Sequence, residues 1–303
     1  MKKLFILLPL LLTTLILSAC QTKTYDIVVT LYPQYDMVKN IIGDQDLTYT
    51  MILPPGVEIH DFEPTSRQVI QINSAQLFIY TSLELETWAE DILDSDVNAM
   101  NLENYVTDRH EGHDETHDEG VHDVHYWVSV DNQIHMVEAI LEAIIVLDSE
   151  NSAIYIDNAE AYIANLMVVE DALLTLTNTS NTPIYFIGHN IFSALNEEFG
   201  FNIISLTESY SPDADPTSAQ LSQMMSAIMD SHSAYLYYDP FESVNMANTI
   251  KNDLKSTFNY EVTLKPLHSL HNVSKTQFED KISIYDLWME NFQNLRLTLE
   301  MGS

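Results

Sequence analysis

The sequence is poor in cysteine, in basic residues and in long apolar segments, and each shortage excludes a class of protein. Cys20 is the only cysteine among 303 residues, so no disulfide can form within one chain. Twelve lysines and arginines stand against 45 acids, for a formal net charge of -33, whereas nucleic-acid binding needs clustered basic side chains. Beyond residue 20 no apolar run is long enough to span a membrane. The acidic balance instead favours cations as partners.

Apolar residues are plentiful, which excludes a disordered acidic chain. Hydrophobic residues make up 46% of the sequence, with 16 tyrosines and 11 phenylalanines among them. A chain of this length is sufficient for one large domain or for two of ordinary size.

The N-terminus has the pattern of an export signal. Lys2 and Lys3 precede the apolar stretch 4–17, and the small residues Ser18 and Ala19 come directly before Cys20. This pattern predicts a signal peptide over 1–19 and lipidation of Cys20, followed by a linker over 20–24. The protein is therefore expected at the extracytoplasmic face of the cell membrane, anchored by acyl chains on Cys20. Ordinary secretory cleavage beside a chance cysteine is the alternative.

Strand and helix patterns alternate along the rest of the chain, which predicts α/β architecture with parallel sheets. Two groups of four short strands are expected, at 25–31, 47–53, 76–80 and 98–102, and at 183–187, 202–206, 234–238 and 261–267. Helices are expected at 35–42, 66–74, 86–93, 190–199, 217–231, 244–258 and 280–299. The repeat predicts two pseudo-symmetric lobes of similar build.

A long helical stretch separates the two groups of strands. No glycine occurs between residues 121 and 187, and helices are expected over 132–147 and 152–176. A helix of about 25 residues spans about 38 Å, so a stiff connection is expected. The predicted domains are an N-terminal lobe over 25–148, a linking helix over 149–178 and a C-terminal lobe over 179–303.

One segment of the N-terminal lobe, 108–124, is rich in histidine and acid and nearly free of apolar residues. It predicts an exposed loop that collects divalent cations weakly, because imidazole and carboxylate are both metal ligands. A merely solvated charged loop is the alternative. The candidate residues for this auxiliary role are His110, His113, His117 and His122.

Four other histidines stand near the ends of predicted strands or at a helix entry. His60 follows the second strand, His189 follows the fifth, and His271 follows the last, whereas His125 precedes a helix. Parallel sheets present ligands at the carboxyl ends of their strands, so these side chains are expected to converge as a metal site.

The sequence resembles the metal-binding lipoproteins of bacterial zinc and manganese ABC importers, the cluster A-I or cluster 9 substrate-binding proteins. The resemblance covers essentially the whole chain after the signal and rests on segments 56–65, 123–127, 188–200, 211–216 and 267–272. It implies two lobes joined by one long helix, with the ion held between them. It also implies His60, His125 and His189 as the first three ligands, and a histidine-rich loop is typical of the zinc members.

The fourth ligand is where this sequence departs from the family. Family members usually have Glu or Asp at the place of His271, followed by Gly where Asn272 stands here. Either His271 supplies a fourth imidazole, which we favour, or water or another residue fills the position. Four imidazoles suit Zn2+, whereas Mn2+ prefers oxygen ligands. Glu63 is the first candidate for fixing a ligand's tautomer, ahead of Asp123 or Glu58, and capping of the following helix is its alternative role.

The predicted function is capture of Zn2+ and its delivery to the transmembrane subunit of an ABC permease, by a monomer that is not an enzyme. A manganese-binding member of the same family is the alternative. A zinc-dependent hydrolase, with water as the fourth ligand, is disfavoured because the sequence lacks the HExxH spacing and any constellation for covalent catalysis.

Overall fold

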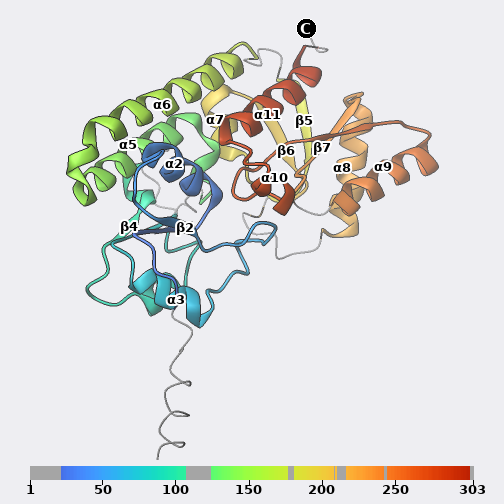
Figure 1. Ribbon diagram of the computed structural model, residues 1–303. Helices are drawn as coiled ribbons and strands as arrows, with labels where there is room; N and C mark the ends of the chain where they lie inside the picture. Colours follow the sequence, from blue (N-terminus) through green and yellow to red (C-terminus); the bar gives the residue numbers. More distant parts are fainter. Residues whose placement is uncertain are drawn as a thin grey trace, which may run out of the picture.

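The computed structural model describes residues 22–106, 124–176, 181–207, 209, 216–241 and 244–300. Within these ranges the chain forms two parallel four-stranded sheets, each flanked by helices (Figure 1). The expected α/β class with two lobes is confirmed.

The first sheet has the strand order β2-β1-β3-β4, and all of its neighbouring strands are parallel. The two central strands are completely buried, as expected where helices cover both faces of a parallel sheet. Its strands are β1 (Ile27–Val29), β2 (Tyr49–Met51), β3 (Leu77–Tyr80) and β4 (Ala99–Asn101).

The second sheet repeats this topology in the order β6-β5-β7-β8, again with parallel neighbours. The repeated order makes the two lobes pseudo-symmetric. Because the strands are parallel, their carboxyl ends lie at one edge of each sheet. Its strands are β5 (Pro183–Ile187), β6 (Asn202–Ser205), β7 (Tyr235–Tyr238) and β8 (Thr263–Pro266).

Most helices of the described ranges lie at the predicted positions, but α4 covers only half of the predicted 86–93 and α10 was not predicted. Three short 3-10 helices accompany them: η1 (Leu102–Tyr105), η2 (Tyr126–Val128) and η3 (Ser149–Asn151). The α-helices are α2 (Tyr32–Ile42), α3 (Ser66–Asn73), α4 (Ala89–Ile92), α5 (Val130–Leu147), α6 (Ser152–Leu174), α7 (Ser193–Phe199), α8 (Ser218–Asp230), α9 (Val244–Phe258), α10 (Lys275–Glu279) and α11 (Ile284–Leu299).

The last predicted helix, over 280–299, begins four residues too early. The structure ends α10 at Glu279 and starts α11 at Ile284. Between them Lys281 has a positive φ of 56°, and Ser283 caps α11 in a capping box with Asp286. A residue with left-handed backbone geometry interrupts a helix, and the Ser-x-x-Asp pattern then starts a new one.

The long helix α6 joins the lobes, as predicted. It has 23 residues and packs against α5 and α2 of the first lobe and against α11 of the second (Figure 1). The connection is therefore in contact with both lobes along its length.

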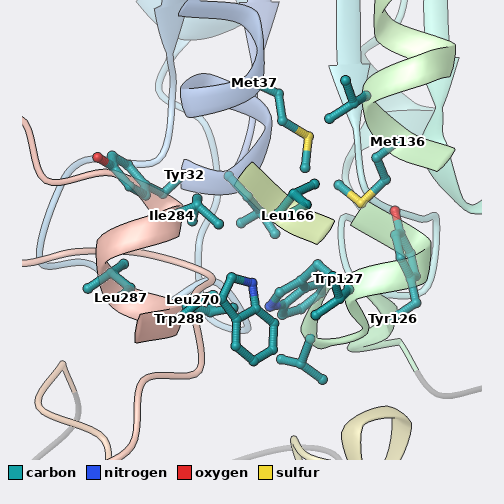
Figure 2. Packing of buried hydrophobic residues seen from close by; sticks show 14 of the residues in the cluster. Tyr32, Met37, Tyr126, Trp127, Met136, Leu166, Leu270, Ile284, Leu287 and Trp288 are labelled. Atoms are coloured by element: carbon teal, nitrogen blue, oxygen red, sulfur yellow. The ribbon is translucent and has the colours of Figure 1, made fainter. Parts of the chain in front are cut away.

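The apolar core is continuous from one lobe to the other. One cluster of buried side chains includes Ile27 and Val29 of β1 as well as Ile184 and Phe186 of β5. Figure 2 shows part of this cluster, with side chains from α2, η2, α5, α6 and α11 and with Trp127 and Trp288 next to each other. Relative movement of the lobes would disturb this shared core.

None of the helices in the described ranges is long and apolar enough to cross a membrane.

Candidate metal centre

His60 lies on the loop that connects β2 with α3. Ile59 beside it is 1% exposed and anchors the loop in the core, while the Phe62 N–H donates to the Ile59 carbonyl at 2.9 Å. The loop ends at Thr65, which caps α3 in a capping box with Gln68. His60 is half-buried, and one of its ring nitrogens lies close to those of two other histidines.

His125 comes directly before η2 and is completely buried. The two residues after it are anchored to different lobes. The Tyr126 hydroxyl donates to the Thr81 carbonyl at the end of β3 (2.9 Å), whereas the Trp127 indole N–H donates to the Ser269 carbonyl of the second lobe (2.9 Å). His125 is therefore held at the boundary between the lobes.

A further bridge crosses the lobes at the first turn of α5. The Glu198 carboxylate on α7 accepts from the Val130 N–H (2.9 Å) and from the Asp131 N–H (3.1 Å). These donors are among the backbone groups that a helix N-terminus leaves without intrahelical partners, and the helix dipole favours a negative charge there. Glu198 thus ties the segment of His125 to the helix that follows His189.

His189 follows β5 and is 3% exposed. The preceding residue must be glycine, because a Cβ at Gly188 would collide with the ring of Phe186. Phe186 itself is fixed by an edge-to-face contact with Phe192, with ring centroids 4.9 Å apart. The strand end therefore presents His189 with little freedom.

The three imidazoles converge, as the sequence predicts. Each offers one nitrogen, and these atoms all lie within 4.8 Å of one another. The ring centroids are 5.6 Å apart for His60 and His125, 5.4 Å for His60 and His189, and 5.1 Å for His125 and His189. Nitrogens bound tetrahedrally at about 2.0 to 2.1 Å from Zn2+ would lie about 3.3 Å apart, so only a modest contraction would bring these three to that spacing.

His271 lies outside this group of three among the described residues. It is 1% exposed; its Nδ1 lies 2.6 Å from the Ser269 hydroxyl, its Nε2 3.5 Å from a Glu58 carboxylate oxygen, and its ring 4.8 Å from that of Phe241. His268 takes a different direction, with its Nε2 2.9 Å from the Glu290 carboxylate on α11. His268 therefore pairs with α11, away from the group of three.

Glu58 is the acid beside these histidines. Its burial alone raises the pKa of the carboxyl, but the charge and hydrogen bond of His271, followed by the charge of His60, outweigh burial and lower the pKa to about 2. Glu63, the first sequence candidate for a supporting acid, is exposed to solvent, and Thr65 rather than Glu63 caps α3.

Several predicted residues lie outside the described ranges: Cys20, Asp123 and the auxiliary histidines His110, His113, His117 and His122. Conversely, sequence reasoning missed Glu198 and gave Glu58 a lesser place than Glu63. Glu58 stands two residues from a predicted ligand, which is a usable signal. Nothing local to Glu198 indicates a partner at the start of α5.

Comparison with known proteins places these features in a family. Residues 27–295 match the family described as ZnuA, zinc-uptake complex component A periplasmic. Zinc-binding lipoprotein AdcA of Streptococcus pneumoniae serotype 4 is 26% identical over 316 residues, which cover 99% of this chain and 62% of that protein. High-affinity zinc uptake system protein ZnuA of Bacillus subtilis is 27% identical over 292 residues, which cover 91% of this chain and 88% of that protein.

Solved structures share the fold. The Zn(II)-bound ZnuA-like domain of Streptococcus pneumoniae AdcA has a TM-score of 0.73 at 23% identity, covering 92% of this chain and 100% of that one. The periplasmic zinc binding protein TroA of Treponema pallidum has a TM-score of 0.78 at 16% identity, covering 91% of this chain and 99% of that one. The chain spans 62% of the length of the AdcA relative from serotype 4.

Proposed function

This chain belongs to the zinc-uptake complex component A family, and on that premise we propose that it captures Zn2+ between its lobes and passes it to an ABC permease. The observation that carries the proposal is the convergence of His60, His125 and His189, whose ligand atoms lie within 4.8 Å of one another although they come from three separate segments. In this proposal the protein is a carrier rather than an enzyme, in line with the description of its family as a zinc-uptake component.

The donor set supports zinc as the cargo. Three imidazole nitrogens suit Zn2+, whereas Mn2+ prefers oxygen ligands and more of them. The two relatives above carry zinc in their names. A zinc hydrolase would need an open metal position with an activated water, and a fourth protein ligand would close it.

The proposed fourth ligand is His271, through its Nε2, because its Nδ1 is engaged by the Ser269 hydroxyl. Glu58, whose carboxylate oxygen lies 3.5 Å from that Nε2, is the competing candidate. If His271 binds the ion, Glu58 becomes a nearby negative charge that offsets the charge of Zn2+. If Glu58 binds the ion, His271 holds the carboxylate in place.

The proposal also includes where the protein is held and how Zn2+ reaches its site. Lipid on Cys20 would hold the protein at the extracytoplasmic face of the membrane, close to its permease. The histidine-rich segment around His117 would gather ions loosely and raise their concentration near the selective site.

Calorimetric titration with Zn2+ and native mass spectrometry test the proposal. We expect one tight site in a variant that lacks residues 108–124, and a loss of more than about 100-fold in affinity for His60→Ala. His135→Ala is the matched control, because this half-exposed histidine lies on α5 outside the group of three. Equal affinity in His60→Ala and His135→Ala would contradict the assignment.

The same titration separates the candidates for the fourth ligand. If His271 binds the ion, His271→Ala weakens Zn2+ binding more than Glu58→Ala does, and the reverse order identifies Glu58. His268→Ala is the control for loss of a buried histidine. Similar small effects in all three variants would leave the fourth position to water.

A further inference from the structure

The loop that carries His60 is attached to the second lobe at several points, and one side chain, Asn272, makes two of the hydrogen bonds. The Asn272 amide donates one hydrogen bond to the Pro54 carbonyl (3.0 Å) and another to the Val57 carbonyl (2.8 Å). Both acceptors precede His60 on the connection from β2, whereas Asn272 follows β8. A backbone hydrogen bond from the Gly56 N–H to the Val273 carbonyl (2.9 Å) runs beside them.

The hydrogen-bonding groups of the Asn272 amide are all used. The residue is 4% exposed, its nitrogen makes the two bonds to the loop, and its oxygen accepts from the Val273 N–H at 2.8 Å. An amide with both donors and its oxygen engaged has one defined orientation. Asn272 is therefore a fixed bridge between the lobes.

The other two histidines of the site are held together independently of this bridge. Glu198 of the second lobe accepts from the first turn of α5, and the Trp127 indole donates to Ser269. His125 and His189 thus form one structural unit with the second lobe. The position of His60 relative to this unit depends on the loop that Asn272 holds.

We propose that Asn272 is a positioning residue that latches the His60 loop to the second lobe and so slows the release of the bound ion. This inference rests on the proposed function, because the ion is the Zn2+ assigned above. Opening of the latch withdraws His60 while His125 and His189 still hold the ion, so the latch controls dissociation more than capture.

Stopped-flow release of Zn2+ into a chromogenic chelator measures the effect. We expect Asn272→Ala to release Zn2+ about tenfold faster than the unaltered protein, the fold-change that corresponds to about 1.4 kcal/mol, which is close to the net worth of one hydrogen bond. The parallel bond from Gly56 remains and limits the effect. Asn272→Ser, whose side chain is too short to reach both carbonyls, serves as the second variant if Asn272→Ala folds poorly.

Asn73→Ala is the matched control. The Asn73 amide donates to the Ile92 carbonyl (2.8 Å) and its oxygen accepts from the Asp94 N–H (3.1 Å), so it performs similar bonding within the first lobe alone. Its release rate should equal that of the unaltered protein. Equal release rates for the unaltered protein and both Asn272 variants, or an equal acceleration by Asn73→Ala, would overturn the inference.

Hydrogen exchange of the zinc-free protein tests the latch separately from zinc binding. The Gly56 amide should exchange about tenfold faster in Asn272→Ala, with a fall of only a few degrees in the melting temperature, whereas a general loss of structure would accelerate amides throughout. If no protein in the series binds Zn2+, the proposed function fails. The exchange rate of the Gly56 amide then still tests the attachment of the loop: an unchanged rate in Asn272→Ala overturns it, and a faster rate supports it.

Discussion

Replacement of Glu198 by alanine tests how firmly the two ligand-bearing segments are joined. The Glu198 carboxylate accepts two backbone N–H groups of α5, at 2.9 and 3.1 Å, across the boundary between the lobes. A hydrogen bond to a charged group contributes about 1.5 to 3 kcal/mol to stability, but Glu198 is partly exposed and water can replace it in the variant. We therefore expect the free energy of unfolding to fall by about 2 kcal/mol.

That loss corresponds to a melting temperature about 4 to 8 °C lower, measured by circular dichroism on the zinc-free protein. Glu197→Ala is the control, because this neighbour on α7 is exposed. Zn2+ affinity should also fall in Glu198→Ala, since one of the two links that fix His125 relative to His189 is lost and only the Trp127 bond to Ser269 remains. A melting temperature equal to that of Glu197→Ala would refute the bridging role of Glu198.

Three further substitutions test the surroundings of the site. Burial raises the pKa of Glu86 from 4.5 to about 7, so between these pH values the folded state binds a proton that the unfolded state does not. The stability that this proton provides is lost as pH rises through about 7. The free energy of unfolding should therefore fall by about 2 kcal/mol between about pH 5.5 and about pH 8. Denaturant titration should show that the free energy of unfolding of Glu86→Gln does not fall in this way. An equal fall with pH in Glu86→Gln and in the unaltered protein would contradict the prediction. Gly188→Ala should cost about 1 to 3 kcal/mol in the same assay and weaken Zn2+ binding, because the new Cβ collides with Phe186; unchanged affinity would show that the strand end tolerates the shift. Trp288→Phe removes the donor to the Gln133 side chain (3.1 Å) and leaves a buried acceptor unpaired, so about 1 to 3 kcal/mol of stability should be lost, and a smaller loss would mean that water enters the core.

The sequence predicted the parts of the molecule that depend on local pattern. The strand 183–187 and the helix 244–258 were expected at the residues where the structure has them, because β-branched and aromatic runs and apolar helical spacing act within a short window. Strand ends explain only part of the convergence of His60, His125 and His189, because His60 and His189 follow strands of different sheets and His125 follows none; their meeting between the lobes was an expectation from the family resemblance.

The contacts that hold the site together were not predictable in this way. Asn272 reaches Pro54, which is 218 residues away in the sequence, and Glu198 reaches Val130, which is 68 residues away. Neither residue type is unusual in a loop or on a short helix, so no local signal separates them from solvated side chains. Glu63 illustrates the converse: its spacing from His60 suggested a supporting role, but the loop turns it toward solvent and places Glu58 beside His271 instead.

Two routes by which an ion could leave the site differ in what they break. A wide hinge motion would separate the lobes through their shared core, expose Trp127 and Trp288, and break the bonds of Trp127 to Ser269 and of Trp288 to Gln133. Exposing a large apolar side chain costs about 1.5 to 3 kcal/mol, so two such residues with their hydrogen bonds already make this route expensive. Local opening of the His60 loop breaks the bonds of the loop to the segment of Asn272, separates Glu58 from His271 and exposes at most one core side chain, Ile59. Because the second route costs less, we expect the loop, rather than the lobes, to set the rate at which the ion is released.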